Sequence, residues 1–196
     1  MVAYVFDKIL QQGARDAPAR VEAARQWYRQ AAQRTAVNPT SLIRSDRERF
    51  RRVPSIGQMY MFQYDAKYKE VLPYWDRFPL VIPFEQTRRG GLASGDGFYG
   101  MNLHYLPLRL RARLMDALYD TVSSDGDQFQ ITYNILNRAA KLRFFRPCVK
   151  HYLFNHVKSQ FFYIDPKEWD IALFLPTERF AKSNKARVHR ESIARV

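Results

Sequence analysis

The sequence predicts an α+β protein: a small antiparallel, barrel-like sheet with helices packed on it and extended basic arms at both ends. Three observations lead to this class. Apolar residues recur at helical spacing before residue 35 and again after residue 106. Between these parts, from Ile56 onward, the pattern alternates and is rich in aromatic residues and prolines, as strands are. Aromatic residues make up 15% of the chain, so a few large side chains suffice to build a core.

The N-terminal part is predicted to be helical. Residues 2–11 have an apolar face, as a short helix or strand would, and Gly13 is expected to end this element. A stronger helix is predicted over 18–34, because it opens with a proline and its apolar residues share one face: Val21, Ala24, Trp27, Tyr28 and Ala31. Asn38-Pro39 then breaks the helical pattern.

Residues 56–106 are predicted to form the curved antiparallel sheet. The string GQMYMFQYDAK alternates as a strand does, and FYGMNLHYL is expected to be a second strand. Pro73, Pro79 and Pro83 suit edge strands or strand ends rather than a central strand. The glycine-rich run from Arg88 to Gly97 is expected to be a turn.

Helical spacing returns at Pro107. We expect helices over 107–122, 129–143 and 148–158, followed by a strand, a turn at Asp165-Pro166 and a last apolar segment. The tail is polar and basic, as an extended arm or a frayed helix would be. These changes divide the chain into an N-terminal helical arm with an arginine-rich linker (1–55), an α+β core (56–180) and a basic tail (181–196).

The chain carries an excess of thirteen positive charges, with 32 Lys and Arg against 19 Asp and Glu. The excess lies in the flanks, since residues 55–100 are neutral whereas residues 1–54 have eleven basic and five acidic side chains. Such a surface attracts polyanions, of which nucleic acid is the commonest. No apolar run approaches the roughly 20 residues that span a bilayer, so we expect no membrane partner.

The candidate binding residues are the basic side chains of these flanks and of one loop. Arginine forks suit phosphate, and they suit the carboxylates of a neighbouring subunit equally well. The candidates are Arg44, Arg47, Arg49, Arg51, Arg52, Arg88, Arg89, Arg109, Arg111, Arg113, Lys182, Lys185 and Arg187. Three aromatic residues of the neutral middle are candidate interface anchors: Tyr74, Trp75 and Phe98.

Two patterns resemble metal or catalytic sites, and we favour an ordinary structural interpretation of both. Cys148 and His151 have one-turn helical spacing, but a second pair at such spacing is missing, so a buried thiol is expected. Asp116 and Asp120 lie four apart on a predicted helix, where they would hold Mg²⁺ in a nuclease or simply face solvent. We therefore expect no enzyme, no cofactor and no metal.

Four strings resemble a small virion protein of T-even-like myophages: LPYWDRFPLVIPFE (72–85), GFYGMNLHYLPLRLRARLMDALYDT (97–121), RFFRPCVKHYL (143–153) and EWDIALFLPTERFAKSNKARVHRES (168–192). The resemblance covers most of residues 56–192 and is looser at the N-terminus. The family carries the label DNA end protector, a head-completion function. The resemblance implies a virion protein assembled in the host cytoplasm, located at packaged genome ends or at the head–tail junction, with no catalytic residue to transfer.

Three functional hypotheses follow. The first is a non-enzymatic virion protein that binds DNA ends or acts at the head–tail junction, with portal or neck subunits as partners in a symmetric assembly. The second is a tail or baseplate assembly protein whose basic arms dock on acidic neighbouring subunits and whose exposed aromatics anchor the interface. The third is a metal-dependent nuclease that uses Asp116 and Asp120.

Overall fold

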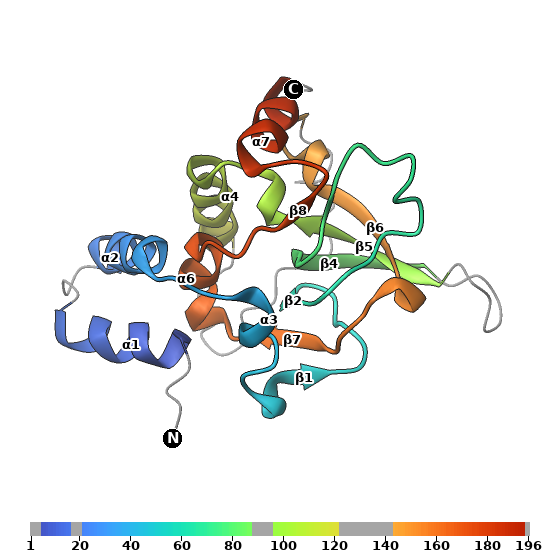
Figure 1. Cartoon of the computed structure of the whole chain (residues 1–196). Helices are drawn as coiled ribbons and strands as arrows, with labels where there is room; N and C mark the ends of the chain where they lie inside the picture. Colours follow the sequence, from blue (N-terminus) through green and yellow to red (C-terminus); the bar gives the residue numbers. More distant parts are fainter. Residues whose placement is uncertain (1–4, 17–20, 88–95, 122–142, 195–196) are drawn as a thin grey trace.

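The computed structural model describes residues 5–16, 21–87, 96–121 and 143–194 (Figure 1). Its helices are α1 (Val5–Asp16), α2 (Val21–Arg34), α3 (Pro39–Leu42), α4 (Leu108–Thr121), α6 (Trp169–Phe174) and α7 (Lys185–Ala194). Its strands are β1 (Phe50–Arg51), β2 (Met59–Met61), β3 (Trp75–Asp76), β4 (Leu80–Thr87), β5 (Gly97–Asn102), β6 (Val149–Leu153), β7 (Phe161–Ile164) and β8 (Phe180–Ala181). Five 3₁₀ turns connect them: η1 (Arg47–Arg49), η2 (Leu103–Tyr105), η3 (Arg143–Cys148), η4 (Phe154–His156) and η5 (Pro166–Glu168).

The strands form a six-stranded antiparallel sheet in the order β1-β7-β2-β4-β5-β6 and a two-stranded sheet of β3 and β8. The α+β class with an antiparallel sheet is therefore confirmed. The barrel-like closure is wrong, because β1 and β6 are the two edges of an open sheet and do not pair. Pro83 lies inside β4 at a register shift, beyond the residues of β4 that pair with β2, so its missing N–H interrupts no ladder on that side.

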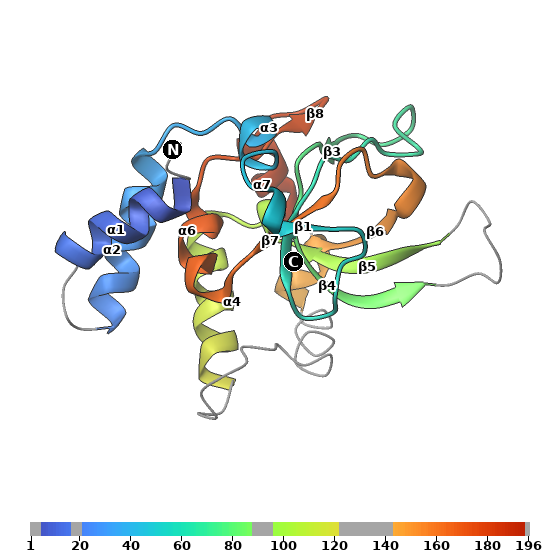
Figure 2. The same ribbon diagram turned by 90° about the horizontal axis from the view of Figure 1, so that it is seen from below.

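The two faces of the sheet bury different side chains because successive residues of a strand point to opposite sides. On one face Met59, Met61 and Phe162 belong to the main core, which the helices cover. On the other face Tyr60 and Phe161 belong to a smaller, mostly aromatic core. Figures 1 and 2 show α1, α2, α4 and α6 together on one side of the six-stranded sheet.

The N-terminal helices contact the rest of the molecule. The Phe6 ring is 1% exposed and stacks on Phe162 of β7 with centroids 6.5 Å apart. Helix α1 does not end at Gly13, as its sequence suggested, but continues to Asp16. Gly13 is instead needed for packing, because a Cβ there would lie 2.3 Å from the Tyr28 ring of α2. The helix predicted over 18–34 is confirmed as α2.

The C-terminal half corrects one prediction and confirms two others. The helix predicted over 148–158 is wrong, because residues 149–153 form the edge strand β6 paired with β5. The helix from Pro107 is confirmed as α4, and the strand and turn around Asp165-Pro166 are confirmed as β7 and η5. The helix predicted over 129–143 falls almost entirely outside the described residues.

The expected basic arms are packed in the structure. Residues 50–51 pair with β7, and α7 buries Val188 completely while contacting η2. The division into residues 1–55, 56–180 and 181–196 stays a prediction, but both outer parts share contacts with the middle one.

Candidate nucleic-acid interface

The arginine segment, residues 44–52, is held on the rim of the sheet by its own turns. Asn38 caps α3, accepting the N–H of Thr40 at 2.9 Å, and Asp46 caps η1, accepting the N–H of Glu48 at 2.9 Å. The segment then enters β1, whose Phe50 pairs with Phe162 of β7. The cap residues thus fix the direction in which its arginines leave the backbone.

Two of the five arginines in this segment serve the fold. The Arg49 guanidinium lies over the Phe6 and Phe162 rings and pairs with the buried Glu168 carboxylate, at 2.9 Å for one of its bonds. The hydrogen bond that Arg49 donates to the Glu168 carboxylate holds the pKa of Arg49 above its ordinary value. Arg51 donates to backbone carbonyls and lies over the Tyr163 ring, although it remains exposed.

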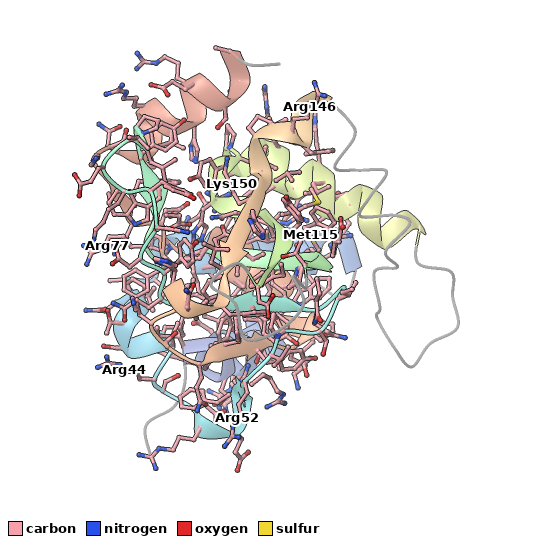
Figure 3. The ribbon with its side chains drawn as sticks, turned by 90° about the vertical axis from the view of Figure 1, so that its right-hand side faces the viewer. Arg44, Arg52, Arg77, Met115, Arg146 and Lys150 are labelled. Atoms are coloured by element: carbon pink, nitrogen blue, oxygen red, sulfur yellow. The ribbon has the colours of Figure 1, made fainter. Side chains whose placement is uncertain are left out.

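The other three, Arg44, Arg47 and Arg52, are exposed. None of them forms an ion pair or a side-chain hydrogen bond with another described residue. The exposed carboxylate among them is Glu48. Figure 3 shows Arg44 and Arg52 at the lower end of the molecule, away from Arg146 and Lys150. These three side chains are free to meet phosphate.

Arg77 and Arg179 extend this basic surface, and sequence reasoning missed them. They line an open hollow of about 530 Å³ together with Asn38, Thr40 and Gln63. The Arg77 N–H donates to the Arg179 carbonyl at 2.9 Å, so the two arginines meet although they lie 102 positions apart. Each is isolated in its own stretch of sequence, and only the pairing of β3 with β8 reveals the cluster.

The basic residues of the C-terminal tail have two different environments: one of them holds a loop, and the others lie on an exposed helix face. Lys182, in a left-handed backbone conformation with φ 60°, donates its ammonium to the carbonyls of Lys69 and Glu70. Lys185 and Arg187 lie on the exposed side of α7, where Arg187 pairs with Glu191 at 2.7 Å. The tail and the arginine segment are therefore separate clusters, at opposite ends of the view in Figure 1.

Arg111 is a structural residue in this fold. Its side chain is 0% exposed and donates to the carbonyls of Leu106 at 2.7 Å and Leu173 at 2.9 Å, and to the Glu178 carboxylate. It cannot reach a ligand from there. Its helical neighbours Arg109 and Arg113 are exposed. Arg88 and Arg89 lie outside the described residues.

The Arg111–Glu178 pair predicts a specific response to acid. Burial, the largest single cause, raises the pKa of the Glu178 carboxyl, but the charge and hydrogen bond of Arg111 together with His104 and a backbone hydrogen bond lower that pKa to about 2, from 4.5. A carboxyl whose pKa falls on folding stabilises the protein above its unfolded pKa, and this stabilisation is lost as the pH falls through the folded pKa. In urea titrations, the gap in unfolding free energy between wild type and Glu178→Gln is expected to shrink as the pH falls from about 4.5 to 2. A gap that stays constant over this range contradicts the assignment.

The three candidate aromatic anchors are less exposed than the sequence suggested. Phe98 is 0% exposed and belongs to the aromatic core, where it stacks on Tyr152 with centroids 5.3 Å apart. It is therefore not available as an interface anchor. Tyr74 is 7% exposed and packs on Tyr105. Trp75 is partly buried.

Tyr74 and Trp75 line a pocket of about 430 Å³, called here the aromatic pocket. Its other walls include Tyr68, Tyr105, Lys150 and Ser192. They come from the loop before β3, from η2, from β6 and from α7. The structure thus brings the predicted aromatics beside the C-terminal helix, a meeting that spacing in the sequence did not indicate.

The candidate catalytic pairs have other partners. Asp116 binds Arg25 and Arg29, and the same arginines bind the buried Asp170, at 3.1 and 2.8 Å. Asp120 has no described side chain. Cys148 is buried, which raises the pKa of its thiol to about 12, whereas His151 is exposed and hydrogen-bonds Thr87.

A buried polar network resembles a hydrolase triad only in outline. His104 lies 2.7 Å from Asp76 and 3.1 Å from the Thr177 hydroxyl, but both His104 and Thr177 are 0% exposed. No reactant reaches such a hydroxyl. The role of the network is structural, because it joins β3 to the segment before β8. Among the described residues, no group of three or more His, Cys, Asp or Glu side chains gathers as metal ligands would.

In a comparison with protein families, the model described as phage T4 terminal DNA protecting protein matches residues 3–194. Neither the curated proteins nor the solved structures gave a match. Within the part of the chain that the structure describes, no helix has the length and apolar character of a membrane span.

Proposed function

Because the chain belongs to the family of phage T4 terminal DNA protecting proteins, we propose that it binds the ends of linear phage DNA without cutting them. In this proposal it acts in the virion at the head–tail junction during head completion, beside portal or neck subunits in a symmetric assembly. It reaches the virion from the host cytoplasm.

The observation that carries this proposal is a basic surface that includes three exposed arginines of the arginine segment. Arg44, Arg47 and Arg52 are exposed and have no carboxylate partner among the described residues. Arg77 and Arg179 line the neighbouring hollow. Arginine is the residue best suited to phosphate, and phosphate contacts supply affinity without reading sequence, as protection of any DNA end requires.

The ion pairs formed by the acidic residues support a non-enzymatic role. A nuclease needs carboxylates that converge on a metal ion. Asp116 instead lies between two guanidinium groups, and Asp170 is buried against them. These four side chains join α2 to α4 and α6, so their charges are used in packing.

Binding of the full chain to linear duplex DNA is expected to weaken steeply with salt. Each neutralised phosphate contributes about −0.9 to the slope of log affinity against log salt, so contacts by these arginines give a slope of about −3 to −5. Fluorescence anisotropy over a salt series measures this slope. A flat dependence, or no binding at low salt, contradicts the proposal.

Recognition of the DNA end itself is tested separately, by competition between linear and circular DNA and by protection from an exonuclease. Linear duplex is expected to compete for the protein better than the same length of closed circular DNA, and bound protein is expected to block an added exonuclease. Equal competition by both DNAs, with no block of the exonuclease, would leave only general DNA binding and would overturn the assignment to termini.

The alternative is a tail or baseplate assembly protein whose basic surface meets acidic neighbouring subunits. Exposed apolar residues beside the arginine segment support this alternative, because they suit contact with another subunit: Val53 is 57% exposed and Ile56 is 39% exposed. Locating the chain in a map of the virion separates the two proposals, because density near the portal channel supports the first and density in the tail supports the second.

A further inference from the structure

We propose that the aromatic pocket binds one unpaired nucleotide at the DNA terminus, stacking its base on the pocket's rings and pairing its phosphate with the pocket's lysines. This inference rests on the proposed function and specifies the form of the end that the protein holds. Five features of the pocket support it: its fixed shape, its rings, its unpartnered polar atoms, its charge and its size.

The pocket is preformed. Its outer wall, the loop of residues 65–72, is tied by the Lys69–Asp65 ion pair at 3.1 Å and by the Tyr68 carbonyl, which accepts two backbone N–H groups. The Lys182 ammonium clamps the same loop by two of its carbonyls. A non-glycine residue in the left-handed region, such as Lys182, is strained and persists only where its surroundings hold it there, and strain of this kind collects at functional sites.

The rings offer a stacking surface that any base can use. Tyr68 is 61% exposed on the loop, and Trp75 is a partly buried residue of the pocket wall. Tyr74 and Tyr105 are buried, and their rings contact at a tilt of 37° with centroids 6.0 Å apart. Stacking on aromatic rings is tolerant of sequence, because every base has a π-face.

The pocket also contains polar atoms that lack partners. Among the described residues, three buried side-chain polar atoms have no hydrogen-bond partner, and two of them belong to residues that line this pocket: the Trp75 indole N–H and the Ser192 hydroxyl. Ser192 is 3% exposed. A buried donor without an acceptor is unfavourable, and such groups are rare in folded proteins unless a ligand satisfies them. The edge of a base or a sugar oxygen supplies the missing acceptors.

The charge of the lining selects an anion. Lys67 and Lys150 line the pocket, with the Lys150 ammonium 4.1 Å from the centre of the Tyr105 ring, and none of its described lining residues is acidic. Figure 3 shows Lys150 with Arg146 on the same part of the molecule. Rings together with lysines match a nucleotide better than a neutral or acidic peptide.

The size of the pocket selects an unpaired nucleotide rather than a duplex. A volume of about 430 Å³ is in the range of pockets that hold small ligands, roughly 300–1,000 Å³. Within a duplex the faces of the bases are covered by their neighbours, so only an unstacked base at an end or overhang can enter such a pocket.

The test compares two DNA hairpins, each closed at one end and either blunt or carrying a few unpaired nucleotides at the other. The full chain is expected to bind the overhang hairpin more tightly. Loss of a stacking ring costs about 1–3 kcal/mol per base, so Tyr68→Ala is expected to weaken overhang binding at least about fivefold and to leave blunt binding unchanged.

Two matched variants control this result. Val71→Ala removes an apolar side chain that is 81% exposed on the same loop but does not line the pocket, and it is expected to have no effect. Ser192→Ala is expected to weaken overhang binding only. If blunt and overhang hairpins bind equally while salt-dependent binding persists, the pocket proposal is wrong and the proposed function stands. If neither hairpin binds, both fail.

A second measurement does not depend on how the variants fold. An overhang with a photoreactive terminal thymidine is expected to cross-link to peptides that contain Tyr68 or Trp75. Cross-links confined to peptides of the arginine segment would place the terminus elsewhere and overturn the proposal.

Discussion

Arg111→Ala is expected to lower the free energy of unfolding by about 3–5 kcal/mol, the usual cost of removing one partner of a buried ion pair. The substitution leaves the Glu178 carboxylate buried without its cation, and it strips donors from the carbonyls of Leu106 and Leu173. Because the free energy of unfolding of a natural domain is only about 5–15 kcal/mol in total, this one change is expected to remove much of the stability. Urea denaturation followed by circular dichroism measures it.

Two further variants show whether charge is the cause. Arg111→Lys keeps the charge but loses the planar fork that serves several acceptors at once, so an intermediate loss is expected. The double variant Arg111→Met, Glu178→Leu removes both charges and is expected to be more stable than Arg111→Ala. If Arg111→Ala loses less than about 1 kcal/mol, the guanidinium is not the anchor that its contacts indicate.

The triple variant Arg44→Gln, Arg47→Gln, Arg52→Gln is expected to weaken binding to linear DNA at least about tenfold at low salt and to reduce the salt slope by about 3. The reason is that each phosphate contact contributes about one unit to the slope. Stability is expected to stay within about 0.5 kcal/mol of wild type, because all three side chains are exposed and unpaired among the described residues. Anisotropy titrations at several salt concentrations measure both affinity and slope.

The matched control removes three exposed cations from the N-terminal helices: Lys8, Arg15 and Arg34, each changed to Gln. It alters the net charge equally but leaves the arginine segment intact, so only a small loss of affinity is expected. If both triple variants lose affinity to the same extent, net charge alone drives binding and the arginine segment is not the interface.

The class of the fold and several elements were predictable because their signals are local. Helix α2 shows five apolar residues on one face, and α4 follows a proline with apolar residues at helical spacing. The strand β6 was not predictable, because Val149–Leu153 becomes a strand only by pairing with β5, whose nearest residue is 47 positions earlier. The Cys148-x-x-His151 spacing, which begins one residue before β6, has the spacing of a helical turn although these residues are not α-helical.

The sequence predicted the type of the candidate site, a cluster of basic side chains, but not which residues belong to it. Clustered arginines mark residues 44–52, but the sequence does not say that Arg49 turns inward to Glu168. One signal was available for Arg111: it lies on the same apolar stripe of α4 as Leu108 and Met115, which argues for burial. Arg77 gave no signal, because its partner Arg179 is distant in the chain.

The sequence by itself determined the composition of this protein's surface: a large positive excess, carried mainly by arginines. It also determined the strings that mark the family. Only the tertiary structure decided which of those arginines meet distant carboxylates and which remain exposed, because burial and ion pairing are set by residues far along the chain. The aromatic pocket was decided in the same way, since its walls come from four separate segments and no local pattern encodes their meeting.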